Sequence, residues 1–329
     1  MNTLQTLRYG LGLTFDGYRQ LAFINRWLKP MVHKHCVELG YELSPSEKKK
    51  VLFYYPMYTV LACAEMYVSV KGRNLSKEET KRLTLVGAMA TLCDDLIDED
   101  NWTRNEIFML LSADINRANL STKAKLLIAL NNELKSFWTL TDRYLNQLKI
   151  ALEWQAKSGR QLDPDIKLDE IVHLCREKNG NTSLMFASLV DEDWTKQELD
   201  FIYQSAIVGQ LTNDSFDMYF DTQNGIYTYF NKASDIEQVR EFFIGECKVL
   251  HAMVRNCSTK EQYKKNTIRR MCILHAFTLT ALDQFQNTED KYGPVFEWKN
   301  LPRKDMVIDM AKNKNRFKTV RYMKWLAEQ

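Results

Sequence analysis

Proline, the residue that most strongly interrupts helices, is scarce along most of this chain. None occurs between Pro56 and Pro164, and none between Pro164 and Pro294. A β protein needs turns at intervals of about 8–12 residues, and prolines often mark them. Within these runs apolar residues recur at spacings of three and four, as in the stretch 126–134, which is the pattern of an amphipathic helix. We therefore predict an all-α fold that forms a single domain over residues 1–329.

Composition narrows the classes of partner and compartment. The chain is 45% hydrophobic, enough for a sizeable core, and its net charge of +3 does not indicate nucleic-acid binding. The 7 cysteines are scattered and form no CxxC pair, so a disulfide framework or zinc site is not expected. The N-terminal residues lack the pattern of a signal peptide. These features predict a cytoplasmic protein.

One segment, 51–70, is apolar enough to require comparison with a membrane span. Its length of about 20 residues would suffice to cross a bilayer. It also contains Glu65, and an ionisable group at membrane depth is costly. We expect a buried helix of a large α domain and no stable membrane span.

The first of two acidic clusters runs from Asp94 to Asp100. The sequence Ser76-Lys77-Glu78-Glu79 is a capping-box pattern that predicts the start of a helix leading into it. No charged residue occurs from Leu83 to Cys93, so this helix is expected to be buried. On a helix Asp94 and Asp98 share one face and Asp95 flanks them, an array that suits Mg²⁺. A solvated helix end is the alternative interpretation.

The second cluster lies in an apolar stretch, 198–220, that reads as another long buried helix. Asn213, Asp217 and Asp221 follow one another at spacings of four, so they share a face that drifts by about 40° per step. Buried polar groups need partners, which a metal ion can supply. A network of hydrogen bonds between helices is the alternative.

Together the clusters resemble the class I isoprenoid synthase family, which includes terpene cyclases, trans-prenyltransferases and squalene/phytoene synthases. The segment Asp94-Asp95-Leu96-Ile97-Asp98 matches the DDxxD motif of that family in full. Asn213 and Asp214 match the start of the terpene cyclase pattern NDxxSxxxE, with Asp217 and Asp221 in its Ser/Thr and Glu places. The run that begins at Gln210 also resembles the QLTNxxxDxxxD pattern of squalene/phytoene synthases.

The resemblance implies an antiparallel helical bundle around a deep apolar cavity, and about three Mg²⁺ ions that bind an allylic prenyl diphosphate. The implied metal ligands are Asp94, Asp95, Asp98, Asn213, Asp217 and Asp221. Asp94 and Asp98 would also act directly in ionising the substrate.

Basic groups would complete the diphosphate site. Arg176 and Lys178 precede Gly180, a glycine that could interrupt a helix, in a region where the family has a diphosphate-sensing basic residue. A solvated helix terminus is the alternative. Arg321 and Tyr322 resemble the C-terminal Arg-Tyr pair of bacterial terpene cyclases, and a basic amphipathic tail is the alternative there.

The chemistry expected from the resemblance is cyclisation, reached by elimination. The RRG element of prenyltransferases and the YxxxVAGxVG segment of squalene/phytoene synthases are both missing. The positions before DDxxD, Met89 and Ala90, are not aromatic and permit a farnesyl or longer chain. A prenyl-coupling synthase and a non-catalytic isoprenoid-binding partner subunit remain as alternatives. The sequence is compatible with a homodimer and does not determine the oligomeric state.

Overall fold

The computed structural model describes residues 3–113, 120–293 and 297–328, and every regular element in these ranges is helical. The all-α prediction is therefore confirmed. The first half contains α1 (Thr3–Phe23), η1 (Ile24–Leu28), α2 (Lys29–Glu38), α3 (Pro45–Lys49), η2 (Lys50–Tyr54), α4 (Tyr55–Met57), η3 (Tyr58–Ala64), α5 (Glu65–Ser69), α6 (Lys77–Asp98), α7 (Arg104–Ser112), α8 (Thr122–Phe137) and α9 (Asp142–Lys157). The second half contains η4 (Ser158–Leu162), α10 (Leu168–Ala187), α11 (Lys196–Gln223), α12 (Tyr229–Lys232), α13 (Ile236–Asn256), α14 (Glu261–Tyr292), η5 (Trp298–Asn300), α15 (Arg303–Met306) and α16 (Asn313–Leu326).

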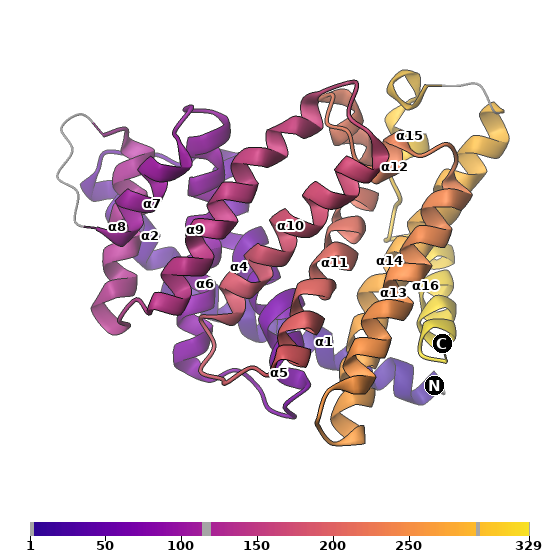
Figure 1. The fold of residues 1–329 in the computed structure, drawn as a ribbon, viewed down its shortest axis with the longest axis horizontal. Coiled ribbons are helices and arrows are strands. Elements are labelled where there is room, and N and C mark those ends of the chain that lie inside the picture. Colours follow the sequence, from indigo (N-terminus) through magenta and orange to yellow (C-terminus); the bar gives the residue numbers. More distant parts are fainter. Residues whose placement is uncertain (1–2, 114–119, 294–296, 329) are drawn as a thin grey trace.

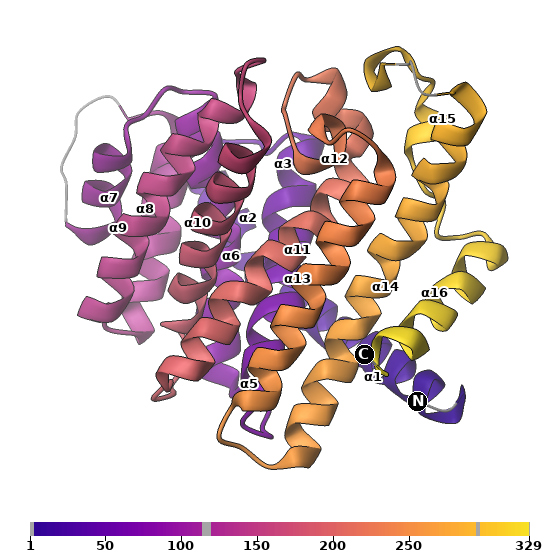
Figure 2. The same cartoon turned by 45° about the vertical axis from the view of Figure 1, so that its right-hand side comes forward.

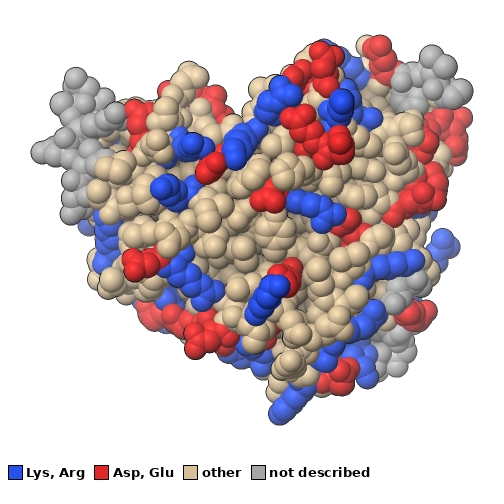
Figure 3. All heavy atoms as spheres, viewed as in Figure 1, with Lys and Arg blue, Asp and Glu red and all other residues tan. Residues whose placement is uncertain are grey.

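The long helices from α9 onward form one continuous row. In this row α9, α10, α11, α13 and α14 each pack against the next, and α16 packs on α14 (Figures 1 and 2). Behind the row lie α6 and the helices of residues 45–69. On the face in Figure 3, acidic and basic side chains are intermixed around a centre with few charges.

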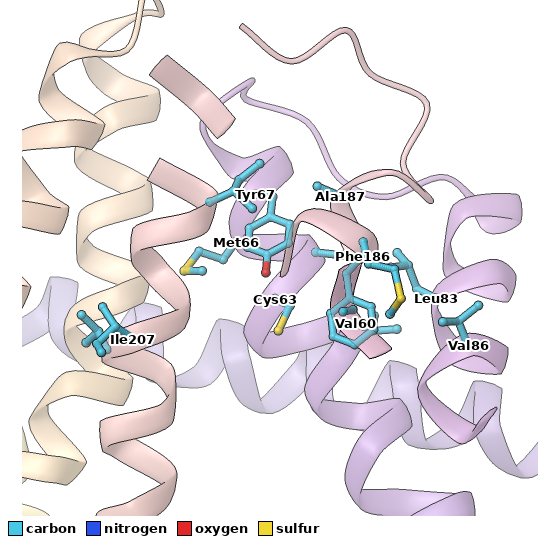
Figure 4. Packing of buried hydrophobic residues seen from close by; sticks show 14 of the residues in the cluster. Val60, Cys63, Met66, Tyr67, Leu83, Val86, Phe186, Ala187 and Ile207 are labelled. Atoms are coloured by element: carbon cyan, nitrogen blue, oxygen red, sulfur yellow. The ribbon is translucent and has the colours of Figure 1, made fainter. Parts of the chain in front are cut away.

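The segment from Pro45 to Ser69 is a continuous helix in the middle of the molecule, which we call the central helix. It packs against α6 on one side and reaches α10 and α14 on the other. Figure 4 shows residues such as Val60 and Cys63 of this helix between Ile207 of α11 and Val86 of α6. These side chains belong to one core cluster that extends from α1 to α16.

Two stretches of the central helix, Lys50–Tyr54 and Tyr58–Ala64, are π-helical. Pro56 lies between them. Proline has no N–H to donate and its ring clashes with the carbonyl of the preceding turn, so an ordinary α-helical ladder cannot pass through it. Short π-helical turns inside α-helices often occur at functional sites.

Among the described residues, the central helix is the helix whose length and apolarity would allow it to cross a membrane. In its most apolar window, 56% is buried inside the protein. Core helices of soluble proteins also meet this criterion, so our expectation of a buried helix rather than a span stays a prediction.

The helices that carry the acidic clusters begin and run as the sequence predicts. Ser76 caps α6: its hydroxyl accepts from the backbone N–H of Glu79, and the Glu79 carboxylate accepts from the N–H of Ser76. A second capping box, between Thr195 and Glu198, starts α11. Residues 83–89 of α6 are buried, which confirms the expectation drawn from their lack of charge.

Candidate functional site

A cavity of about 420 Å³ lies between α6, α10 and α11. Three aspartates and one lysine line it: Asp94 from α6, Asp214 and Asp221 from α11, and Lys178 from α10. We call it the carboxylate cavity. Gln210 and Asn213 of α11 also line it, and the rest of its wall includes Val86, Met89, Ala90, Leu111, Leu148, Leu152, Met185 and Phe186. The two acidic clusters therefore meet across a space whose wall combines these apolar side chains with polar ones such as Gln155, Asn179 and Thr182.

The close approach of α10 and α11 brings Lys178 into this cavity. We expected that Gly180 could interrupt the helix, but α10 continues through it to Ala187. A Cβ at Gly180 would lie 2.3 Å from the ring of Tyr203, so glycine is required for the Tyr203 side chain of α11 to rest on the α10 backbone. Gly180 therefore allows tight packing of the two helices.

The carboxyl groups of this cavity hold their protons unusually well. Burial, opposed by Lys178, raises the pKa of Asp94 to about 7. Burial also raises the pKa of Asp214 to about 7, although the Gln210 amide donates a 2.7 Å hydrogen bond to its carboxylate. Burial and the charges of Asp214 and Asp217 raise the pKa of Asp221 to about 8. These shifts follow from placing several like charges in a poorly solvated space.

Lys178 is the one basic residue among the described residues that line the carboxylate cavity. It lowers the pKa of Asp94, Asp98, Asp214 and Asp221, so it lies within electrostatic reach of both clusters. A single positive charge does not balance this many carboxylates. Fully ionised, the cavity would therefore carry a net negative charge that favours cations.

Asp98 lies one turn beyond Asp94 and is exposed at the end of α6. The partial loss of solvent around its carboxyl group raises the pKa of Asp98, while Lys178 and a hydrogen bond with Gln155 lower it. Gln155 lines the carboxylate cavity. Asp98 is thus next to the cavity without being part of its described lining.

The remaining residues of the two clusters have other partners. Asp95 is buried and forms a 2.9 Å ion pair with Lys50 of the central helix. The Asn213 amide donates a 2.9 Å hydrogen bond to Asp217, and its Oδ1 accepts a 2.6 Å hydrogen bond from the Tyr54 hydroxyl. Asp95 and Asp217 do not appear among the residues lining the carboxylate cavity.

Asp217 lines a second cavity, of about 890 Å³, on the other side of Tyr54, Tyr55 and Tyr58. Lys49 and Lys50 line the same cavity as Asp217, and Lys49 lowers the pKa of Asp217, which burial raises. Deeper in, its lining is mostly apolar and includes Cys63, Met66, Leu250, Met271 and Leu274.

The other residues predicted to complete the diphosphate site lie away from the carboxylate cavity. Arg176 donates a 2.6 Å hydrogen bond to Glu246 of α13 and a 3.2 Å hydrogen bond to Gln204 of α11. Tyr322 of α16 donates a 2.7 Å hydrogen bond to Asp283 of α14, and Arg321 is exposed. The structure therefore brings Lys178 to the carboxylates but not Arg176, Arg321 or Tyr322.

Asp214 is a residue of this site that our set of predicted metal ligands omits. The signal for it is its spacing of seven from Asp221, which on a helix leaves the two side chains within about 20° of each other. Gln210 falls on the same narrow stripe. Asn213 and Asp217 lie on an adjacent stripe, where Asn213 lines both cavities and Asp217 lines the second cavity.

The donor chemistry of the carboxylate cavity suits Mg²⁺, which prefers carboxylate and amide oxygens. No group of three or more His, Cys, Asp or Glu side chains within the described ranges is arranged to hold a metal ion by itself. Mg²⁺ is commonly held by one or two carboxylates, with water and substrate phosphates completing its shell. The residues present fit that mode of binding.

Comparisons of the chain with protein-family models, curated proteins and solved structures gave no match.

Proposed function

We propose that this chain is a Mg²⁺-dependent class I terpene synthase that ionises an allylic isoprenoid diphosphate and cyclises the resulting carbocation. The observation that carries the proposal is that one cavity is lined by Asp94 of α6, by Lys178 of α10, and by Asp214 and Asp221 of α11. The all-α architecture and the apolar part of the cavity wall agree with the helical bundle that such an enzyme requires.

In this proposal α6 and α11 hold the metal ions from opposite sides. Bound Mg²⁺, about three ions in this proposal, would stabilise the negative charge that develops on the diphosphate as its bond to carbon breaks. Asp94, Asp214 and Asp221 are the ligands that the cavity favours, and Asp98 stands at its edge. Lys178 would donate hydrogen bonds from its ammonium group to diphosphate oxygens that the metals leave free.

The wall of the cavity would protect the carbocation. Met89, Ala90, Leu152 and Phe186 offer an apolar surface that excludes water. The ring of Phe186 and the rings of Tyr55 and Tyr58 also line the cavity, and aromatic faces attract positive charge. These residues would hold the hydrocarbon chain in a folded shape before ring closure.

A prenyl-coupling synthase is the second candidate, and the second cavity favours it. This cavity adjoins the carboxylate cavity at Asn213 and has Lys49 and Lys50 beside an apolar interior, which suits a second substrate with an anionic end. A coupling enzyme would need such a second substrate, whereas a cyclase would not.

The test is incubation of the purified protein with Mg²⁺ and geranyl, farnesyl, geranylgeranyl or geranylfarnesyl diphosphate, each with and without isopentenyl diphosphate. Organic products are identified by gas chromatography–mass spectrometry. Asp94→Asn and Asp214→Asn remove carboxylates from the cavity, and Asp100→Asn is the matched control because it removes an exposed carboxylate from the same acidic run.

We expect a cyclic hydrocarbon or alcohol from one diphosphate alone. Its formation should fall by at least about 100-fold in both cavity variants and stay unchanged in Asp100→Asn. A product of two substrates would establish coupling instead. Equal activity in Asp94→Asn, Asp214→Asn and the wild type would refute the metal site, and inactivity toward all of these diphosphates would count against both candidates.

A further inference from the structure

Three tyrosines of the central helix separate the two cavities. Tyr54, Tyr55 and Tyr58 line both the carboxylate cavity and the second cavity, and so does Asn213 of α11. We call these three side chains the tyrosine wall. A residue that borders two adjacent cavities contributes to the partition between them.

The wall extends from the central helix to α11 and touches it at two levels. The Tyr54 hydroxyl donates to Asn213, 2.6 Å away. One turn earlier on α11, a Cβ built on Gly209 would lie only 3.1 Å from the Tyr58 hydroxyl. The absence of a side chain at Gly209 thus lets the Tyr58 phenol reach the α11 backbone.

The two contacts lie at different depths relative to the carboxylates. Asn213 is next to Asp214, at the polar end of the cavity, and Tyr54 beside it is 42% exposed. Gly209 lies one turn farther from Asp221, and Tyr58 beside it is half-buried. A hydrocarbon chain that extends away from a diphosphate at the carboxylates would therefore meet Tyr58 rather than Tyr54.

Behind Tyr58 the space is large and apolar. The second cavity measures about 890 Å³, against about 420 Å³ for the carboxylate cavity. Cys63 and Met66 line it, and they follow Tyr58 on the same helix. Shortening the side chain at position 58 would join the two spaces.

We propose that Tyr58 limits the length of the hydrocarbon chain that the carboxylate cavity accepts, by closing it off from the second cavity. The inference rests on the proposed function, because it assigns the carboxylate end of the cavity to the diphosphate. Tyr58 contacts the chain's far end and determines specificity. It contacts the hydrocarbon part of the substrate and not the diphosphate.

The test compares the wild type with Tyr58→Ala, Tyr58→Leu and Tyr58→Phe. Phenylalanine keeps the ring and is the matched control, while leucine keeps an apolar branched side chain in case alanine prevents folding. The first readout is the ratio of kcat/KM for geranylgeranyl diphosphate to that for farnesyl diphosphate. We expect this ratio to rise by at least about tenfold in Tyr58→Ala and Tyr58→Leu and to stay unchanged in Tyr58→Phe.

A second readout does not depend on turnover or metal. Isothermal titration calorimetry gives the dissociation constants of farnesol and geranylgeraniol, which lack the diphosphate. Tyr58→Ala and Tyr58→Leu should improve the binding of geranylgeraniol relative to farnesol by a similar factor, and Tyr58→Phe should not.

The two readouts separate the two proposals. An unchanged alcohol ratio in a folded Tyr58→Leu protein, verified by circular dichroism, would overturn the role of Tyr58. If the wild type converts no diphosphate while the alcohol ratio shifts as expected, the proposed function fails and the partition stands. If the wild type is active and both ratios are unchanged, the partition alone fails.

Discussion

Lys50 of the central helix and Asp95 of α6 form an ion pair with 2.9 Å between Nζ and Oδ1. The Asp95 side chain is only 6% exposed, whereas that of Lys50 is 41% exposed. The pair connects the two helices next to the carboxylate cavity, and Lys123 is a more distant partner at 4.0 Å. Two adjacent aspartates of one acidic run thus have different surroundings.

This pair should contribute to stability. Lys50→Met leaves the buried Asp95 carboxylate without its nearest partner, and we expect the free energy of unfolding to fall by about 1–3 kcal/mol. Lys48→Met is the control, because Lys48 pairs with Glu42 on the surface, where the effect should stay within about 0.5 kcal/mol. Urea denaturation measures both, and equal stability of the two variants would contradict the prediction.

Replacement of Lys178 should affect activity and its pH dependence together. Lys178 lowers the pKa of Asp94, Asp214 and Asp221, so Lys178→Gln should raise the pKa of all three carboxyl groups. The rise of activity with pH should move to higher pH, and kcat/KM should fall by about 10²–10³. Lys178→Arg keeps the charge and should retain most of the pH profile. A Lys178→Gln profile that coincides with that of the wild type would exclude this role.

Metal-free protein should lose stability as the pH rises. The pKa of Asp221 is raised from its usual 3.8 to about 8, so the folded state binds a proton that the unfolded state has released. The contribution of this bound proton to the free energy of unfolding is complete below about pH 4, and it is lost as the pH rises through about 8. Asp221→Asn removes this titration, so its melting temperature should fall less steeply with pH than that of the wild type. Parallel curves for the two proteins would rule out the shift.

Mg²⁺ should reverse this loss at alkaline pH. Its carboxylate ligands must be deprotonated, so its affinity should increase as the pH passes the values of about 7 for Asp94 and Asp214. We expect the rise in melting temperature caused by Mg²⁺ to be larger at about pH 8 than at about pH 6. Asp94→Asn should reduce the rise, and Asp100→Asn should not. A rise independent of pH would argue against these ligands.

Replacements of Arg176 and Arg321 should differ in their effect on the stability of the protein, and neither should affect catalysis. Arg176 joins α10 to Glu246, a side chain that is 11% exposed, so Arg176→Met should destabilise the protein by about 1–3 kcal/mol. Arg321 is exposed, and Arg321→Met should change stability by less than about 0.5 kcal/mol. We expect KM for a diphosphate substrate to be unchanged in both. A raised KM in either variant would show that the replaced arginine contributes to diphosphate binding.

Local sequence rules predict the helices of this site well. The capping box at Ser76, the uncharged stretch before Asp94 and the apolar stretch around the second cluster all correspond to observed features of α6 and α11. These signals depend on residues a few positions apart. The local sequence of each segment is therefore enough to find these signals.

The partners of the acidic residues could not be predicted in the same way. Spacing shows that Asn213 and Asp217 share a face, but not that this face meets Tyr54 and Lys49 of a distant helix. The same holds for Asp95, whose partner Lys50 is set by the crossing of two helices. Such contacts depend on how two helices are oriented relative to each other, and the amphipathic pattern of one helix does not determine that orientation.

The π-helical turns of the central helix make the boundary between the cavities sensitive to insertions and deletions in the polypeptide. A π turn holds about one residue more than an α turn, and each residue turns a helix by about 100°. Deleting one residue from 59–64 would allow an ordinary α-helix there, and would rotate Tyr54, Tyr55 and Tyr58 away from α11 while every remaining side chain kept its identity. The size and connection of the cavities are thus encoded partly in the backbone register, so insertions and deletions can remodel this interior as effectively as substitutions.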